Sequence, residues 1–153
     1  MQTTPVSGMA PASEPASGRE VGHYSCRSMT GNCAALQSLA DEPGRVQMNP
    51  ADAQRLGIAD KQLVWVSSRR GKVISRADLS DRINPGAVYM TYQWWVGACN
   101  ELTQDNLDPI SKTPETKYCA VKVEAIADQQ WAERYAWTAY SDMKARLKAA
   151  ADV

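Results

Sequence analysis

Short apolar segments separated by polar turns dominate the middle of the chain. Four of these segments have the composition of β-strands, and they lie at residues 46–48, 63–68, 73–79 and 87–90. A polar turn that contains Gly71 joins the second segment to the third, so this pair predicts a β-hairpin. Residues 117–125 alternate apolar and polar side chains, which is typical of a half-buried strand. The middle of the chain is therefore predicted to be mainly β.

Helices are predicted from capping residues and from apolar side chains that repeat every three or four positions. Asn49 suits an N-cap, Pro50 the first helical position and Gly57 the C′ position, which together predict a short capped helix. Two helical turns are expected within residues 34–40. Residues 128–150 carry apolar side chains every three or four positions. That stripe consists of Ala136, Tyr140, Met143, Leu147 and Ala150. It predicts a long amphipathic helix whose apolar face packs on this domain or on a neighbouring one.

These elements divide the chain into three parts. Residues 1–18 are rich in Pro, Ser, Ala and Thr and lack the features of a signal peptide, so they predict a disordered leader or linker. Residues 19–127 hold the short strands and suit a small closed β-barrel, since closure removes exposed strand edges. Residues 128–153 form the C-terminal helix. The expected fold class is mainly β with helices (α+β).

Composition argues against several classes of protein. The 153 residues include 17 basic and 17 acidic side chains, whereas a general nucleic-acid binder carries a basic footprint. No apolar run has the length of a membrane span. A single histidine and the lack of a catalytic constellation leave little from which to build a free-standing hydrolase or metal enzyme.

The cysteines form no CxxC pair, so we expect neither a zinc site nor an iron–sulfur cluster made by this chain alone. They are Cys26, Cys33, Cys99 and Cys119. Their number allows two disulfides, but no feature of the sequence indicates secretion. Free thiols in a reducing cytosol are the simpler interpretation.

Two polar segments lack the period of a helix or a strand. Residues 19–34 mix small polar residues with a histidine and arginines, and residues 92–103 hold Trp94 and Trp95 among amides and hydroxyls. Loops on a rigid scaffold are where binding residues gather, so these segments are the candidate binding site. The tryptophan rings would either stack on a flat ligand or fill a seam with another domain.

Several segments match a known family, in the same order along the chain. They read GHYSCRSMTGN from Gly22, NPADAQRLGI from Asn49, YMTYQWWVGACNELT from Tyr89 and DPISKTPETKYCAV from Asp108. From about residue 19 to its C-terminus, the chain resembles the C-terminal domain of molybdopterin-dependent formate dehydrogenases. The likeness is greatest to the cytoplasmic, formate hydrogenlyase type.

This resemblance implies a six-stranded double-psi β-barrel that binds the bis-MGD cofactor, two molybdopterin guanine dinucleotides that chelate molybdenum or tungsten. Catalytic residues, metal ligands and iron–sulfur clusters belong to other domains of the family, so none is expected here. Those domains are the expected partners, rather than nucleic acid or a membrane. The implied function is the cofactor-binding domain, as a fragment or split subunit, of a cytoplasmic enzyme that oxidises formate to CO2. The alternative is a non-catalytic orphan module for cofactor binding or assembly.

The resemblance also assigns cofactor-binding residues. In the first segment, backbone N–H groups and hydroxyls would hold the pterin or pyrophosphate, and Arg27 would add charge near the metal. In the second, Asn100 suits a pterin or guanine edge and Lys117 suits an anionic oxygen. The expected residues are Arg19, His23, Tyr24, Ser25, Cys26, Arg27, Ser28, Tyr92, Asn100 and Lys117. Four of these residues also allow purely structural roles instead of cofactor binding: a histidine bonded inside its loop, a solvated arginine, an asparagine that caps its own loop and a lysine at a strand edge.

The sequence departs from the family at two places. Where the family has an apolar barrel strand, residues 12–18 read ASEPASG, which suits a strand poorly. This leaves open a barrel that lacks its first strand. Thr116 stands where an aromatic residue is common, so looser packing is expected beside Lys117.

Overall fold

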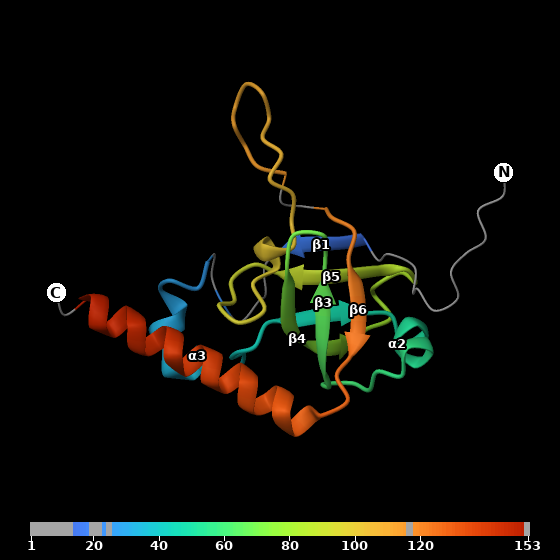
Figure 1. Cartoon of the computed structure of the whole chain (residues 1–153), viewed down its shortest axis with the longest axis horizontal. Coiled ribbons are helices and arrows are strands. Elements are labelled where there is room, and N and C mark those ends of the chain that lie inside the picture. The colour runs from blue at the N-terminus through green and yellow to red at the C-terminus, as the bar shows by residue number, and fades with distance from the viewer. Residues whose placement is uncertain (1–13, 19–22, 24–25, 116–117, 152–153) are drawn as a thin grey trace.

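The computed structural model describes residues 14–18, 23, 26–115 and 118–151. Within these residues, one six-stranded mixed sheet has the strand order β1-β5-β2-β4-β3-β6, and a long helix lies beside it (Figure 1). The strands are β1 (Glu14–Gly18), β2 (Arg45–Met48), β3 (Leu63–Ser67), β4 (Lys72–Leu79), β5 (Ala87–Thr91) and β6 (Lys122–Ala125). The helices are α1 (Ala34–Gln37), α2 (Pro50–Leu56) and α3 (Gln129–Ala151), with short 3-10 turns η1 (Thr30–Asn32) and η2 (Cys99–Glu101).

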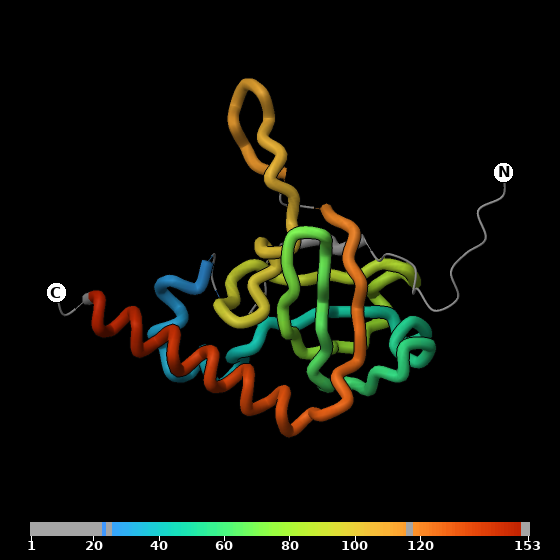
Figure 2. The backbone as a smooth tube through the Cα atoms, viewed as in Figure 1, coloured from blue at the N-terminus to red at the C-terminus, as the bar shows by residue number. Residues whose placement is uncertain are grey.

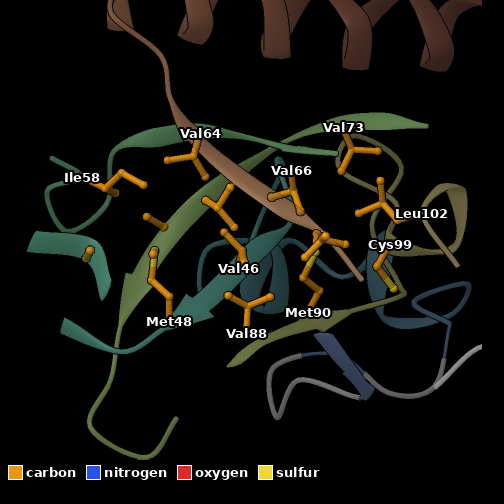
Figure 3. Packing of buried hydrophobic residues seen from close by; sticks show 14 of the residues in the cluster. Val46, Met48, Ile58, Val64, Val66, Val73, Val88, Met90, Cys99 and Leu102 are labelled. Atoms are coloured by element: carbon orange, nitrogen blue, oxygen red, sulfur yellow. The ribbon is translucent and has the colours of Figure 1, made fainter. Parts of the chain in front are cut away.

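Strands that are distant in the sequence pair side by side in the sheet. β1 runs parallel to β5 and β2 runs parallel to β4, whereas β2 and β5 are antiparallel. β3 is antiparallel to β4, with which it forms the predicted hairpin, and to β6. The sheet curls around a buried face (Figure 3). This arrangement confirms the expected fold class, a double-psi β-barrel followed by a C-terminal helix.

The first strand of the barrel is present, contrary to the alternative that the sequence left open. Residues 14–18 form β1, with Glu14 opposite Ala87 and Gly18 opposite Thr91, so assigning these five residues to a leader was wrong. The strand lies at one end of the sheet order. Proline is tolerated in an edge strand because no second neighbouring strand requires a hydrogen bond from its backbone nitrogen. Strand pairing uses backbone groups, which even a sequence of small residues supplies.

Apolar side chains from β2, β3 and β5 meet inside the curled sheet (Figure 3). Val46 and Met48 of β2 alternate with half-buried polar neighbours, as the two faces of a strand require. The main cluster includes Val46, Met48, Val64, Val66, Val88, Met90 and Leu102. A smaller cluster lies beneath α3, where Leu63 and Ile74 pack on Ala132, Ala136 and Tyr140. The barrel thus has one principal core and a second contact layer under the helix.

Helix α2 begins and ends where the capping residues predict. The Asn49 side chain accepts a hydrogen bond from the backbone N–H of Ala51 at 2.9 Å, and its amide donates to the carbonyl of Ile83 at 2.8 Å. Pro50 occupies the first turn, and Gly57 ends the helix in the left-handed region with φ of 67°.

Replacing this cap should weaken the fold by a modest amount. We expect Asn49→Ala to lower the free energy of unfolding by about 1 kcal/mol, because the helix loses the acceptor for its first N–H groups. Urea denaturation followed by tryptophan fluorescence measures the change. Gln54→Ala, at an exposed position of the same helix, is the control and should change stability by less than about 0.5 kcal/mol. Equal effects of the two substitutions would contradict the capping role.

Helix α3 is attached to the barrel along its first half. The Gln129 amide both accepts from the backbone N–H of Leu63 and donates to its carbonyl, at 2.8 and 2.9 Å. Arg76 of β4 forms a two-pronged ion pair with Glu133. Beyond Met143 the described helix becomes exposed on all sides, and this part includes Leu147 of the predicted stripe. Only half of that stripe is covered by this domain.

A long arm projects from the barrel between η2 and β6. In Figure 2 the tube of residues 103–115 rises away from the sheet and turns back on itself. A single bridge joins Leu107 to Pro114, and the Asp108 carboxylate accepts from the N–H groups of Ile110 and Ser111 at the tip. Of the strand predicted at residues 117–125, the described residues form the regular strand β6, and residue 117 lies outside them.

Candidate functional site

His23 lies inside the protein. Its Nε2 atom donates a hydrogen bond to the carbonyl oxygen of Ala40 at 2.7 Å, and its Nδ1 atom lies 3.0 Å from the hydroxyl of Thr30. Both ring nitrogens are therefore engaged within the chain. This geometry favours a histidine bonded inside its own loop, and its role toward a cofactor stays a prediction.

Arg27 is buried, with 4% of the residue exposed. Its guanidinium forms ion pairs with Glu42 and, at 2.8 Å, with Asp41, and it donates to the Gln37 side chain at 2.6 Å. The same group lies 4.8 Å from the centre of the Trp94 ring, in a cation–π contact. The interpretation of Arg27 as a solvated surface arginine is therefore wrong. Its charge is balanced within the protein by neighbouring carboxylates.

Glu42 connects the two candidate segments. One carboxylate oxygen accepts from Arg27 and from the backbone N–H of Trp95 at 3.2 Å, and the other accepts from the N–H of Val96 at 3.0 Å. Burial raises the pKa of Glu42, while these two N–H groups and then the guanidinium act in the opposite direction. A single buried carboxylate thus fixes the Arg27 turn against the loop that follows β5.

The two adjacent tryptophans have opposite environments. Trp94 is buried, with its ring edge-on to His23 at 5.8 Å between centroids and its indole N–H donating to the hydroxyl of Thr91. Trp95 is 51% exposed. Trp94 therefore belongs to the interior of the loop, and Trp95 is the ring that remains available to a ligand or to another domain.

Gly44 permits this close packing. A Cβ atom at position 44 would lie 2.6 Å from Cδ1 of Trp94, which is closer than real contacts allow. The backbone N–H of Gly44 donates to the carbonyl of Val96, and its own carbonyl accepts from the N–H of Arg76, both at 2.9 Å. The loop with Trp94 is consequently tied to β4.

The predicted site residues fall into three groups. Cys26 and Ser28 are exposed beside the buried Arg27, and Ser28 lines a hollow of about 430 Å³ together with Arg27 and Trp95. Tyr92 is half-buried and packs against the core, and Asn100 is exposed in η2. Arg19, Tyr24, Ser25 and Lys117 lie outside the described residues. The structure brings the turn at residues 26–32 against the loop at residues 94–96.

Gln93 is a candidate that the sequence did not single out. The residue is 3% exposed, and neither polar atom of its side chain has a hydrogen-bond partner among the described residues. Buried amides are nearly always bonded, so an amide in this state next to Tyr92 suits the polar edge of a ligand. The one signal in the sequence was its place within the aromatic loop. The unpartnered donor and acceptor of Gln93 are therefore groups that the edge of a pterin or guanine would satisfy.

The cysteines separate into an exposed and a buried pair. Cys26 and Cys33 are exposed thiols, and Cys99 and Cys119 lie in the main core. Burial raises the pKa of the Cys99 thiol to about 11, with a further contribution from Cys119 nearby. Burial also raises the pKa of Cys119. The core thiols are thus inert packing groups rather than nucleophiles.

Native thiol labelling should reveal these two classes. At pH 8 we expect iodoacetamide to modify Cys26 and Cys33 readily, and Cys99 at least about 100-fold more slowly, because a pKa that rises by about two units lowers the thiolate fraction by that factor. Mass spectrometry of peptides from timed samples measures each rate. All four should react at similar rates in denaturant. Rapid native labelling of Cys99 would contradict the packing.

Comparison with known proteins decides the family. The model of the molydopterin dinucleotide binding domain matches residues 16–120. The chain belongs to the molybdopterin dinucleotide-binding domain family. This confirms the resemblance seen in the sequence. The matched range includes the last three residues of β1 and both segments of the candidate site.

Two relatives in sequence are formate dehydrogenases. The domain is 68% identical over 133 residues to formate dehydrogenase H of Escherichia coli (strain K12), which covers 87% of this chain and 19% of that protein. It is 42% identical over 109 residues to the F420-dependent formate dehydrogenase 2 subunit alpha of Methanococcus maripaludis, covering 71% of this chain and 16% of that protein. The domain therefore spans less than a fifth of the length of each of these relatives.

A solved structure shares the fold of the domain at low sequence identity. Acetylene hydratase from Pelobacter acetylenicus matches with a TM-score of 0.63 and 15% identity, over 75% of this chain and 18% of that one. Among the described residues, no helix is long and apolar enough to cross a membrane. The same residues contain no group of three or more His, Cys, Asp or Glu side chains that could hold a metal ion.

Proposed function

We propose that this chain is the bis-MGD-binding domain of a molybdenum- or tungsten-dependent formate dehydrogenase that oxidises formate to CO2 in the cytoplasm. The observation that carries this proposal is the 68% identity to formate dehydrogenase H over 87% of the chain. The catalytic residues, metal ligands and iron–sulfur clusters belong to other domains of that enzyme, and these domains are the proposed partners.

The geometry supports a binding role rather than a catalytic one. The candidate loops hold amides, hydroxyls and an aromatic ring, while the guanidinium of Arg27 beside them forms ion pairs with Glu42 and Asp41. When bound, bis-MGD supplies the redox metal centre. A protein of this kind contributes binding and orientation.

Particular groups of the chain would hold the cofactor. Asn100 and Gln93 offer planar donor and acceptor pairs suited to a pterin or guanine edge, and the Ser28 hydroxyl suits a pyrophosphate oxygen. Tyr92 supplies a half-buried ring on the wall of the barrel. The predicted contributions of Arg19, His23, Tyr24, Ser25, Cys26, Arg27 and Lys117 complete the proposed set. The buried ion pair of Arg27 with Glu42 keeps both loops in place for this purpose.

Cofactor retention tests the proposal. The matching region of the Escherichia coli relative is replaced by this chain, and the purified chimera is assayed for metal, for released guanine nucleotide and for pterin fluorescence after denaturation. We expect retention close to that of the unaltered relative. A folded chimera without pterin or metal would count decisively against the proposal.

A pair of substitutions adds a test of the site itself. Asn100→Ala should lower pterin content at least several-fold, because it removes a planar amide from the proposed binding loop. Asn106→Ala, an exposed amide in the projecting arm, is the matched control and should retain normal content. Equal contents in the two variants would remove Asn100 from the proposed site.

A further inference from the structure

Three adjoining hollows form a continuous groove along α3. The first, about 190 Å³, lies between β3, β4 and the helix; the second, about 430 Å³, lies between the Arg27 turn and the helix. Trp95 and Met143 line both of them. A third hollow of about 440 Å³ continues toward the C-terminal end of the helix and shares Met143 and Leu147 with the second. We refer to these three together as the α3 groove.

The α3 groove has an apolar floor, and cations outnumber carboxylates on its rim: Lys72, Lys144 and Arg146 stand against Glu101 and Asp142. Trp95 is 51% exposed and Leu147 is 48% exposed, and both line the second hollow together with Met143. Lys72 lies 4.6 Å from the centre of the Trp65 ring, and Lys144 lies 5.0 Å from that of Tyr140. In the part of the chain that the structure describes, neither ammonium forms an ion pair within 4.0 Å, although Lys72 acts at longer range and, after Lys122, helps to lower the pKa of Glu124. The groove therefore complements a segment that carries both apolar side chains and carboxylates.

Trp95 is held ready for a contact. Its backbone N–H is bound by the buried carboxylate of Glu42, while the ring stands between two hollows. A large aromatic ring that is already ordered loses little conformational entropy on binding, and such residues dominate the energy of interfaces. The ring is thus suited to act as an anchor in an interface.

The length of the relatives indicates what covers the groove. The chain spans 19% of formate dehydrogenase H, so about four-fifths of such an enzyme lies outside this domain and must pack somewhere on it. The second hollow includes Ser28 and Arg27 of the candidate cofactor loops, so an enzyme body that encloses a cofactor there would reach the groove directly. The second half of the α3 stripe continues the same surface away from the barrel.

We propose that the α3 groove is the docking surface for an acidic, apolar-faced segment of the catalytic part of the same formate dehydrogenase. Apolar side chains of that segment fill the space beside Trp95, Met143 and Leu147, and its carboxylates face Lys72 and Lys144. This inference rests on the proposed function, since the occupant is the remainder of that enzyme.

Site-directed photo-cross-linking tests this contact. In the full-length chimera of the Escherichia coli relative carrying this chain, a benzophenone amino acid replaces Leu147, and in a matched control it replaces the exposed Gln54 of α2, at the far end of the barrel (Figure 1). We expect irradiation to join position 147 to peptides of the catalytic part, and position 54 to yield at least several-fold less of that product. The charge reversals Lys144→Glu and Lys72→Glu together should lower the cross-link from position 147 several-fold.

Other results would overturn the proposal. They are the lack of any cross-link from position 147, equal yields from positions 147 and 54, cross-links from 147 to a second copy of the chain, or yields that the charge reversals do not change. If the chimera does not accumulate, the same probes are placed at the corresponding positions of the unaltered relative, where an unlinked position 147 is equally decisive.

Pterin and metal content of the same samples separates the two proposals. Normal pterin and metal content without a cross-link from position 147 would contradict the proposed docking surface but not the proposed cofactor-binding function. A cross-link to the catalytic part in protein that lacks pterin would support the docking surface and reject the cofactor-binding function.

Discussion

Arg27→Met should lower the free energy of unfolding by about 3–5 kcal/mol at pH 8, because it leaves the buried Glu42 carboxylate without its counter-ion. The loss should shrink in acid. Burial already raises the pKa of Glu42 above its usual 4.5, and removal of the guanidinium raises it further. A group whose pKa is higher in the folded state loses its stabilising contribution as the pH rises through that value. Urea denaturation at pH 5 and pH 8 measures both effects.

A control and a double variant give this prediction its specificity. Arg76→Met removes a two-pronged ion pair with Glu133 that is partly exposed, and it should cost about 1 kcal/mol or less. Adding Glu42→Gln to Arg27→Met removes the unpaired charge, so the double variant should regain stability at pH 8 and lose the part of the pH dependence that Glu42 causes. A single variant that loses less than about 1 kcal/mol at pH 8 would show that Glu42 does not depend on Arg27.

Local signals in the sequence were sufficient for most of the barrel. The hairpin of β3 and β4 follows from two apolar runs around a glycine turn, and α2 follows from Asn49, Pro50 and Gly57. β1 could not be recognised in this way, because Pro15 and its small neighbours carry no strand preference. Its pairing with β5 depends on tertiary structure, because the unpaired edge of β5 accepts hydrogen bonds from any segment whose backbone reaches it.

Local sequence signals were not sufficient for the candidate site. The resemblance located both segments, but nothing local marked Glu42 as the group that joins them. Its bonds span 15 residues to Arg27 and 54 to Val96, distances over which no periodic pattern operates. Trp94 and Trp95 are likewise equivalent in sequence, and contacts made in the fold, among them the close approach of the Trp94 ring to Gly44, distinguish the buried ring from the exposed one. The fold adds the contact between the two segments through Glu42, and their joint role as one cofactor site stays a prediction.

The cation–π contact of Arg27 adds a consequence for the loop as a whole. The guanidinium touches the Trp94 ring, while the carboxylate that neutralises it binds the next two backbone N–H groups. Loss of either ionic partner therefore acts on three successive residues that precede Gly97. The end of this loop is constrained by sterics as well as by charge.

Gly97→Ala is the second substitution with a large expected effect. Gly97 has φ of 81°, and a Cβ atom there would lie 2.5 Å from the carbonyl oxygen of Ile74 in β4. The left-handed backbone costs about 1–2 kcal/mol for a residue other than glycine, and displacement of a packed strand adds about 1–3 kcal/mol. We therefore expect the free energy of unfolding to fall by about 2–5 kcal/mol, which urea denaturation at neutral pH measures.

Gly57→Ala separates the two causes of this loss. Gly57 also has a positive φ, of 67°, but a Cβ atom there meets nothing within 4 Å. Its replacement should cost only the backbone term of about 1–2 kcal/mol. Because the variants share the backbone strain, the difference between them reports how closely the loop that presents Trp95 is pressed onto β4. If both alanines cost the same, the loop can move away from Ile74 freely, and the fixed placement of Trp95 on which the docking surface depends would be lost.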